Sequence, residues 1–118
     1  MKTFLAIYLG SADSQKRTAW DNLDGPTRQQ QEEAGMKAWH GWMAEHKSAL
    51  VFEGGPLGKT KKVSDAGITD TKNAMTGFVI LRAETHDAAT RMFKNHPHFA
   101  IFPGDAVEIM ECLPIPTM

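Results

Sequence analysis

The sequence predicts an α+β fold of the ferredoxin-like kind, a βαββαβ sandwich with an inserted hairpin, in a single domain over residues 1–118. A chain of this length suits one domain with one modest core. Apolar strand patterns alternate with helical patterns along it, and only two substantial helices are expected. Two helices can cover one face of a four-stranded antiparallel sheet, which is the arrangement we expect.

The N-terminal half contains a strand and a long helix. Residues 3–9 are apolar on both faces, which is typical of a central buried strand. A short helical turn is expected around Trp20. Pro26 suits a helix N-terminus, so a helix is predicted over residues 27–47. Its apolar stripe consists of Met36, Trp39, Trp42, Met43, His46 and Leu50.

The second half holds the other strands and the second helix. Thr85 can cap this helix, and the segment 95–97 ends it because the residue before a proline is pushed out of the helical region. Gly54-Gly55-Pro56 is expected to end the second strand. The strands are predicted at 49–53, 75–83 and 106–113, with a small hairpin over 62–68.

The strands over 3–9 and 75–83 are apolar on both sides, yet the predicted helices cover one face of the sheet only. A single domain of this size has nothing left to cover the second face. We therefore expect a homodimer that packs sheet against sheet.

Composition excludes several classes of protein. Thirteen Lys and Arg against 14 Asp and Glu give a formal charge of −1, so no nucleic-acid or anionic-membrane partner is expected. The apolar run over 4–9 is too short for a signal segment or a membrane span. The single cysteine, Cys112, excludes an intramolecular disulfide framework and is expected to be a small buried hydrophobic residue. These features favour a cytoplasmic protein.

Gly54-Gly55-Pro56-Leu57-Gly58-Lys59-Thr60 resembles a phosphate-binding loop, but Glu53 stands where that motif needs glycine and no helix is expected to follow. Two interpretations remain. The glycines can serve only the turn, or they can line a pocket and offer N–H groups to an anionic substrate. In the second interpretation Lys59 attracts a carboxylate. The candidate substrate-binding residues are Trp39, Gly54, Gly55, Pro56, Gly58 and Lys59.

Five histidines are the other candidates for chemistry. His40 lies at the rim of the helical stripe, where a partly desolvated imidazole can act as a general base. His96 and His98 flank Pro97; they can be acid–base groups, or ordinary residues at a helix end. A metal site would need a third ligand at a suitable spacing, so we expect no metal and no cofactor.

Several segments together resemble the YCII-related family, within the dimeric α/β-barrel superfamily of ferredoxin-like folds. The resemblance rests on the strand TFLAIYL, Trp39-His40, Gly54-Gly55-Pro56, the strand Gly77–Leu81, the turn His96-Pro97-His98-Phe99 and the strand Val107-Glu108-Ile109. It implies a homodimer in which two sheets form a barrel. Better-known relatives include a dehydrochlorinase of chlorinated aromatic compounds and muconolactone isomerase.

The resemblance also implies an acid–base pair made of a helix histidine and an aspartate in the turn after the second helix. His40 matches the first position. His96 stands where relatives carry the aspartate of Asp-Pro, and Asp70 is then the candidate for the missing carboxylate.

The expected function is therefore that of a cofactor-free acid–base lyase or isomerase acting on a small anionic organic molecule. It would resemble a dehydrochlorinase or a lactone isomerase, with His40, His96, His98 and Asp70 as catalytic residues. The alternative is a non-catalytic, dimeric module that binds a small ligand in the same cavity. Metal-dependent oxygen chemistry, a third hypothesis, is poorly supported by the ligand spacings.

Overall fold

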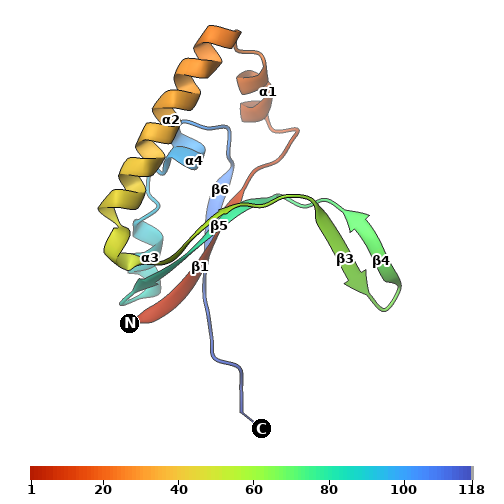
Figure 1. The fold of residues 1–118 in the computed structure, drawn as a ribbon, viewed down its shortest axis with the longest axis vertical. Helices are drawn as coiled ribbons and strands as arrows, with labels where there is room; N and C mark the ends of the chain where they lie inside the picture. Colours follow the sequence, from red (N-terminus) through yellow and green to blue (C-terminus); the bar gives the residue numbers. More distant parts are fainter. Residues whose placement is uncertain (118) are drawn as a thin grey trace.

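A computed structural model describes residues 1–117. Its main layer is a four-stranded sheet in the order β2-β5-β1-β6, and every neighbouring pair is antiparallel. The helices lie over one face of this sheet (Figure 1). This is the arrangement of a ferredoxin-like α+β sandwich. The sheet consists of β1 (Lys2–Leu9), β2 (Leu50–Pro56), β5 (Met75–Ala83) and β6 (Ala106–Glu111).

The helical layer is built around one long helix. Asp24 caps it by accepting a hydrogen bond from the Thr27 backbone N–H at 2.7 Å, so the helix begins before the predicted residue 27. The Thr85 cap is confirmed, because its hydroxyl accepts from the Ala88 N–H at 3.0 Å. The helices are α1 (Gln15–Asp21), α2 (Gly25–Glu45), the 3₁₀ turn η1 (Lys47–Ala49), α3 (His86–Arg91) and α4 (Pro97–Ala100).

The core lies between the sheet and the helices. Residues of β1 and β5 that share this face are almost fully buried, and Trp42 of α2 packs on them. The Trp42 indole also donates to the Met92 carbonyl oxygen at 2.7 Å, which ties α2 to the segment after α3. The buried hydrophobic residues are Phe4, Ala6, Tyr8, Trp42, Val79, Leu81, Ala83, Ala89 and Phe93.

The opposite face of the sheet carries apolar side chains that no helix covers. Strand register places Leu5 opposite Ile80 on one side and opposite Met110 on the other. Phe52 pairs with Ile80 from the edge strand and is 55% exposed. The two-faced character predicted for these strands is confirmed within one chain, whereas the dimer stays a prediction.

The inserted hairpin forms a sheet of its own. Strands β3 (Thr60–Ser64) and β4 (Gly67–Thr71) pair only with each other, and Gly67 takes a positive φ of 110° in the tight turn. The hairpin projects beyond the end of the main sheet, away from α2 (Figure 1). We call it the arm.

Several further details of the predicted fold are wrong. β2 continues through Gly54 to Pro56, because this stretch still pairs with β5. The second helix ends already at Arg91, and Pro97 begins α4, where its missing N–H costs nothing. The last strand ends at Glu111 rather than residue 113. Cys112 follows it and is exposed rather than buried.

Among residues 1–117, no helix is both long enough and apolar enough to cross a bilayer.

Candidate functional site

A pocket of about 380 Å³ lies between α2 and the sheet. Its wall is mainly aromatic and aliphatic, as in most small-molecule sites. The lining residues are Tyr8, Met36, Trp39, His40, Trp42, Met43, Glu53, Gly54, Gly55, Pro56, Thr76, Gly77, Phe78, Val79, His98 and Phe102.

The structure brings six of the sequence-predicted site residues to this pocket and leaves four outside its wall. Those on the wall are Trp39, His40, Gly54, Gly55, Pro56 and His98. His96 lies behind the wall and is buried. Gly58 and Lys59 lie in the exposed link to the arm.

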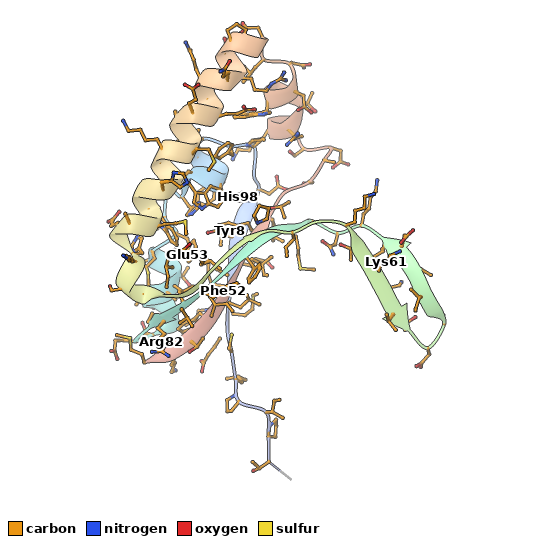
Figure 2. All side chains as sticks on the ribbon, in the orientation of Figure 1. Tyr8, Phe52, Glu53, Lys61, Arg82 and His98 are labelled. Carbon is orange, nitrogen blue, oxygen red and sulfur yellow. The ribbon has the colours of Figure 1, made fainter. Side chains whose placement is uncertain are left out.

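Asp70 lies on the arm, where its carboxylate accepts from the Lys61 ammonium at 2.7 Å. Both side chains are strongly exposed. In Figure 2 Lys61 lies on the arm, away from Tyr8 and His98. Within one chain, Asp70 therefore does not supply a carboxylate to the pocket.

Helix α2 provides one wall. Trp39 packs its ring against those of Tyr8 and His98, with ring centroids 4.9 and 6.1 Å apart. His40, the next residue, is exposed at the mouth and makes no side-chain hydrogen bond with any other residue of the described chain. Gly35 lets the Phe102 ring lie directly on α2, since a Cβ there would come within 2.6 Å of the ring.

His98 is held at the floor by backbone contacts. Its Nε2 lies 2.7 Å from the Leu9 carbonyl oxygen, which can only accept, so Nε2 carries the hydrogen. The ring lies against Gly104, where any Cβ would overlap it. Lys16 donates to the carbonyl oxygens of Phe99 and Gly104, at 2.6 and 3.2 Å, and so fixes the loop beside the histidine.

His96 is 1% exposed and caps α4. Its Nδ1 accepts from the His98 backbone N–H at 3.0 Å. The ring is packed among Trp39, Trp42 and Phe93, with centroids 4.6, 4.8 and 5.7 Å away. A side chain so enclosed cannot touch a ligand in the pocket, although it can act on residues that do.

Tyr8 is a wall residue that the sequence did not single out. Its hydroxyl lies 3.4 Å from His96 Nε2, and its ring centroid lies 5.2 Å from that of His98 (Figure 2). On a strand that is apolar on both faces, a tyrosine is expected to be a core residue. The available signal was that Tyr8 is the only tyrosine in the chain and that a buried phenol needs a polar partner.

Burial keeps the floor of the pocket uncharged. Desolvation lowers the pKa of His96 to about 3, and the nearby His98 and His46 rings add to the effect. Desolvation also lowers the pKa of His98, although its hydrogen bond to Leu9 opposes the shift. For Tyr8, burial raises the pKa. At neutral pH the three groups are therefore two neutral imidazoles and one protonated phenol.

The glycine-rich segment closes the pocket on the β2 side. Gly54 has a positive φ of 65°, and a Cβ at this position would overlap the Phe78 carbonyl group. Glycine at 54 is thus required by close backbone approach within the sheet. The one carboxylate on the wall, Glu53, comes from the same strand.

Residues 1–117 contain no group of three or more His, Cys, Asp or Glu side chains arranged to hold a metal ion.

The fold is similar to that of 5-chloro-2-hydroxyhydroquinone dehydrochlorinase (TftG) from Burkholderia phenoliruptrix, solved in complex with 2,5-dihydroxybenzoquinone. The TM-score is 0.51 at 18% sequence identity, and the match covers 92% of this chain and 90% of that one. At this identity the likeness concerns the fold. No protein-family model matches the chain, and no curated protein matches it by sequence. Membership of the YCII-related family stays a prediction.

Proposed function

We propose that the protein is an acid–base enzyme of the lyase or isomerase type, which moves a proton on a small organic molecule bound in the pocket. The observation that carries the proposal is the state of His98. Its Nε2–H is occupied by Leu9, so in the neutral ring Nδ1 is an unprotonated base. Nδ1 has no protein partner, yet every buried side-chain nitrogen and oxygen among residues 1–117 has one. Nδ1 is therefore accessible from outside the packed interior, and we infer that it opens to the pocket that His98 lines.

A neutral imidazole fixed in one tautomer is suited to general-base catalysis. His98 Nδ1 would take a proton from a carbon or oxygen of the ligand. In an elimination, a leaving group such as chloride departs with its bonding electrons, so the ligand loses HCl and no oxidant is needed. In an isomerisation, the same proton returns to another atom of the ligand. His40 at the mouth would exchange the proton with solvent.

The similar structure supports this class of chemistry, because that protein is a dehydrochlorinase bound to a small cyclic dione. The largely apolar wall of this pocket suits an aromatic or cyclic ligand. An anionic ligand, as expected from the sequence, would find polar contacts at the floor and the mouth rather than at Lys59.

We also infer that the protein works as a homodimer. The uncovered face of the sheet supports this, since Leu5, Ile80 and Phe52 form an apolar row across it. A second copy with the same row would bury both faces, as in a barrel of two sheets.

The reaction class is tested with 5-chloro-2-hydroxyhydroquinone as substrate, and turnover is measured as the release of chloride. His98→Gln removes the base, and we expect a 10²- to 10⁴-fold lower kcat. His40→Gln should reduce kcat less. His86→Gln is the matched control, because this exposed histidine lies outside the pocket wall.

A His98→Gln protein as active as the wild type would contradict the proposed base. Tight binding of the chlorinated compound with no chloride release and no proton exchange would favour the binding-module alternative.

A further inference from the structure

The hydrogen bonds behind the pocket have a defined direction. A backbone N–H can only donate, so the bond from His98 N to His96 Nδ1 leaves Nδ1 without a hydrogen. A neutral ring must then carry its hydrogen on Nε2. That atom faces the Tyr8 hydroxyl oxygen at 3.4 Å. Tyr8 is therefore the acceptor in this contact, and its own hydrogen is not used by His96.

The Tyr8 hydroxyl has no other hydrogen-bond partner in the part of the chain that the structure describes. Tyr8 also lines the pocket. The phenol hydrogen is thus available to a molecule bound there, and the burial that keeps the phenol protonated preserves it as a donor.

We propose that Tyr8 is a ligand-binding and catalytic residue that donates its phenolic hydrogen bond to an oxygen of the substrate, and that His96 is the positioning residue that orients it. The proposal rests on the proposed function, whose base it complements. Tyr8 supplies a donor and His98 Nδ1 an acceptor, on rings whose centroids are 5.2 Å apart.

This pair indicates the chemical class of the substrate. A carbonyl or phenolate oxygen would accept from Tyr8 while His98 takes a proton from a neighbouring atom. Negative charge that develops on that oxygen as the proton leaves would be stabilised by the Tyr8 donor. Hydroxyquinones and enolisable ketones have this arrangement, whereas a plain hydrocarbon of the same shape does not.

His96 is well placed to act only through Tyr8. Four aromatic rings surround it: Tyr8, Trp39, Trp42 and Phe93. They leave it no contact with the pocket, and its bond from the His98 N–H fixes the ring orientation. His96 therefore acts as a fixed donor that holds the Tyr8 hydroxyl oxygen in place.

Binding tests the Tyr8 role without requiring turnover. The first probe is 2,5-dihydroxybenzoquinone, and the matched probe is p-xylene, which has a similar ring shape and no oxygen. Tyr8→Phe should weaken binding of the quinone about tenfold and leave the p-xylene Kd unchanged, since tenfold corresponds to about 1.4 kcal/mol, within the range of about 0.5–1.5 kcal/mol for one hydrogen bond. Equal quinone Kd values for Tyr8→Phe and wild type would overturn the proposal, as would equal losses for both probes.

Because Tyr8 is the only tyrosine, ¹³C labelling of tyrosine Cζ gives a single NMR signal. Its chemical shift can be compared between the free protein and the protein with each probe bound. The quinone should move this signal further than p-xylene does, because only the quinone accepts a hydrogen bond from the phenol. Equal shifts for the two probes would overturn the proposal.

Two variants separate positioning by His96 from its packing. His96→Gln can place an amide donor near the former Nε2, whereas His96→Asn can replace only the Nδ1 acceptor. We expect quinone affinity close to wild type for Gln and about tenfold weaker for Asn. If both variants lose affinity equally, or both retain it, His96 does not act through Tyr8.

Should either variant fail to fold, ¹⁵N NMR of wild-type histidine side chains decides the tautomer. A hydrogen on His96 Nδ1 instead of Nε2 would overturn the proposal. If the binding results are as expected but the wild-type protein releases no chloride, the proposed function is contradicted and the binding role of Tyr8 is not.

Discussion

The buried histidines make stability depend on pH. The pKa of His96 is about 3 in the folded chain, against an ordinary value of about 6.5 when unfolded. Between these values the unfolded chain binds more protons, so the free energy of unfolding falls as the pH falls. Burial lowers the pKa of His98 in the same direction. We expect the free energy of unfolding to change by up to ~1.4 kcal/mol per pH unit for each histidine that is protonated in the unfolded chain and neutral in the folded chain.

Urea unfolding at several pH values between 7 and 4 measures this slope. His96→Gln, which cannot titrate, should flatten it if the variant folds. Asp105 does not contribute to the slope above pH 5. Hydrogen bonds from Ser11 lower the pKa of its carboxyl below the ordinary aspartate value, so this group stays ionised over that range. A free energy of unfolding that stays constant from pH 7 to 4 would contradict the burial of neutral His96.

Individual site residues were only partly predictable. His40 could be placed at a rim because the helix period fixes which side chains lie near the apolar stripe. His96 and His98 could be marked as candidates but not given separate roles, because their difference depends on the long-range contacts with Tyr8 and Leu9. Asp70 was proposed from sequence order alone, and the hairpin carries it away from the pocket.

At the scale of elements, Gly54 decides how β2 closes the pocket. Gly54→Ala places a Cβ against the Phe78 carbonyl group and forces a non-glycine residue to a φ of 65°. The left-handed conformation alone costs about 1 kcal/mol, and the overlap adds to it. We expect a loss of 3 kcal/mol or more in the free energy of unfolding, on the order of that for core overpacking or strain.

Gly58→Ala is the matched control for this prediction. A Cβ at Gly58 meets nothing within 4 Å, and its φ is not positive. Urea unfolding should place this variant within about 0.5 kcal/mol of the wild type, as for most surface substitutions. Similar losses for both variants would mean that flexibility of the segment, rather than the Phe78 contact, requires the glycine.

The elements that the sequence predicted best are those with a clear period or a cap. β5 and the Thr85 cap match the predicted positions. The errors arose where a turn residue has a role set by its tertiary neighbours. Gly54 remains in the sheet because Phe78 lies against it, and Pro97 begins a helix because His96 caps it.

At the scale of the whole molecule, the shape and the surface both support the proposed dimer. The Cα radius of gyration is 16.4 Å, whereas a compact chain of this length would have about 13.5 Å. The arm and the segment after β6 extend from the body and account for this excess (Figure 1). Val63 and Ile68 on the arm are 76% and 71% exposed, which is unfavourable unless another surface covers them.

The homodimer is tested most directly through the uncovered face of the sheet. Ile80→Lys places a charge between Phe52 and Leu5, where it is solvated in a single chain and buried unpaired in a sheet-to-sheet dimer. Light scattering at micromolar concentration should give twice the mass of one chain for the wild type and one chain mass for the variant. Circular dichroism should show that the variant keeps its fold.

Gln30→Lys is the control for this change, because Gln30 is exposed on α2 rather than on the sheet. It should remain dimeric. A wild-type protein that is monomeric at this concentration would contradict the dimer, and so would an Ile80→Lys protein that is folded and still dimeric.

Because the pocket lies on the helical face, a monomeric Ile80→Lys protein that still binds 2,5-dihydroxybenzoquinone would show that one chain forms the complete site. Loss of binding together with dimerisation would show instead that the partner completes it.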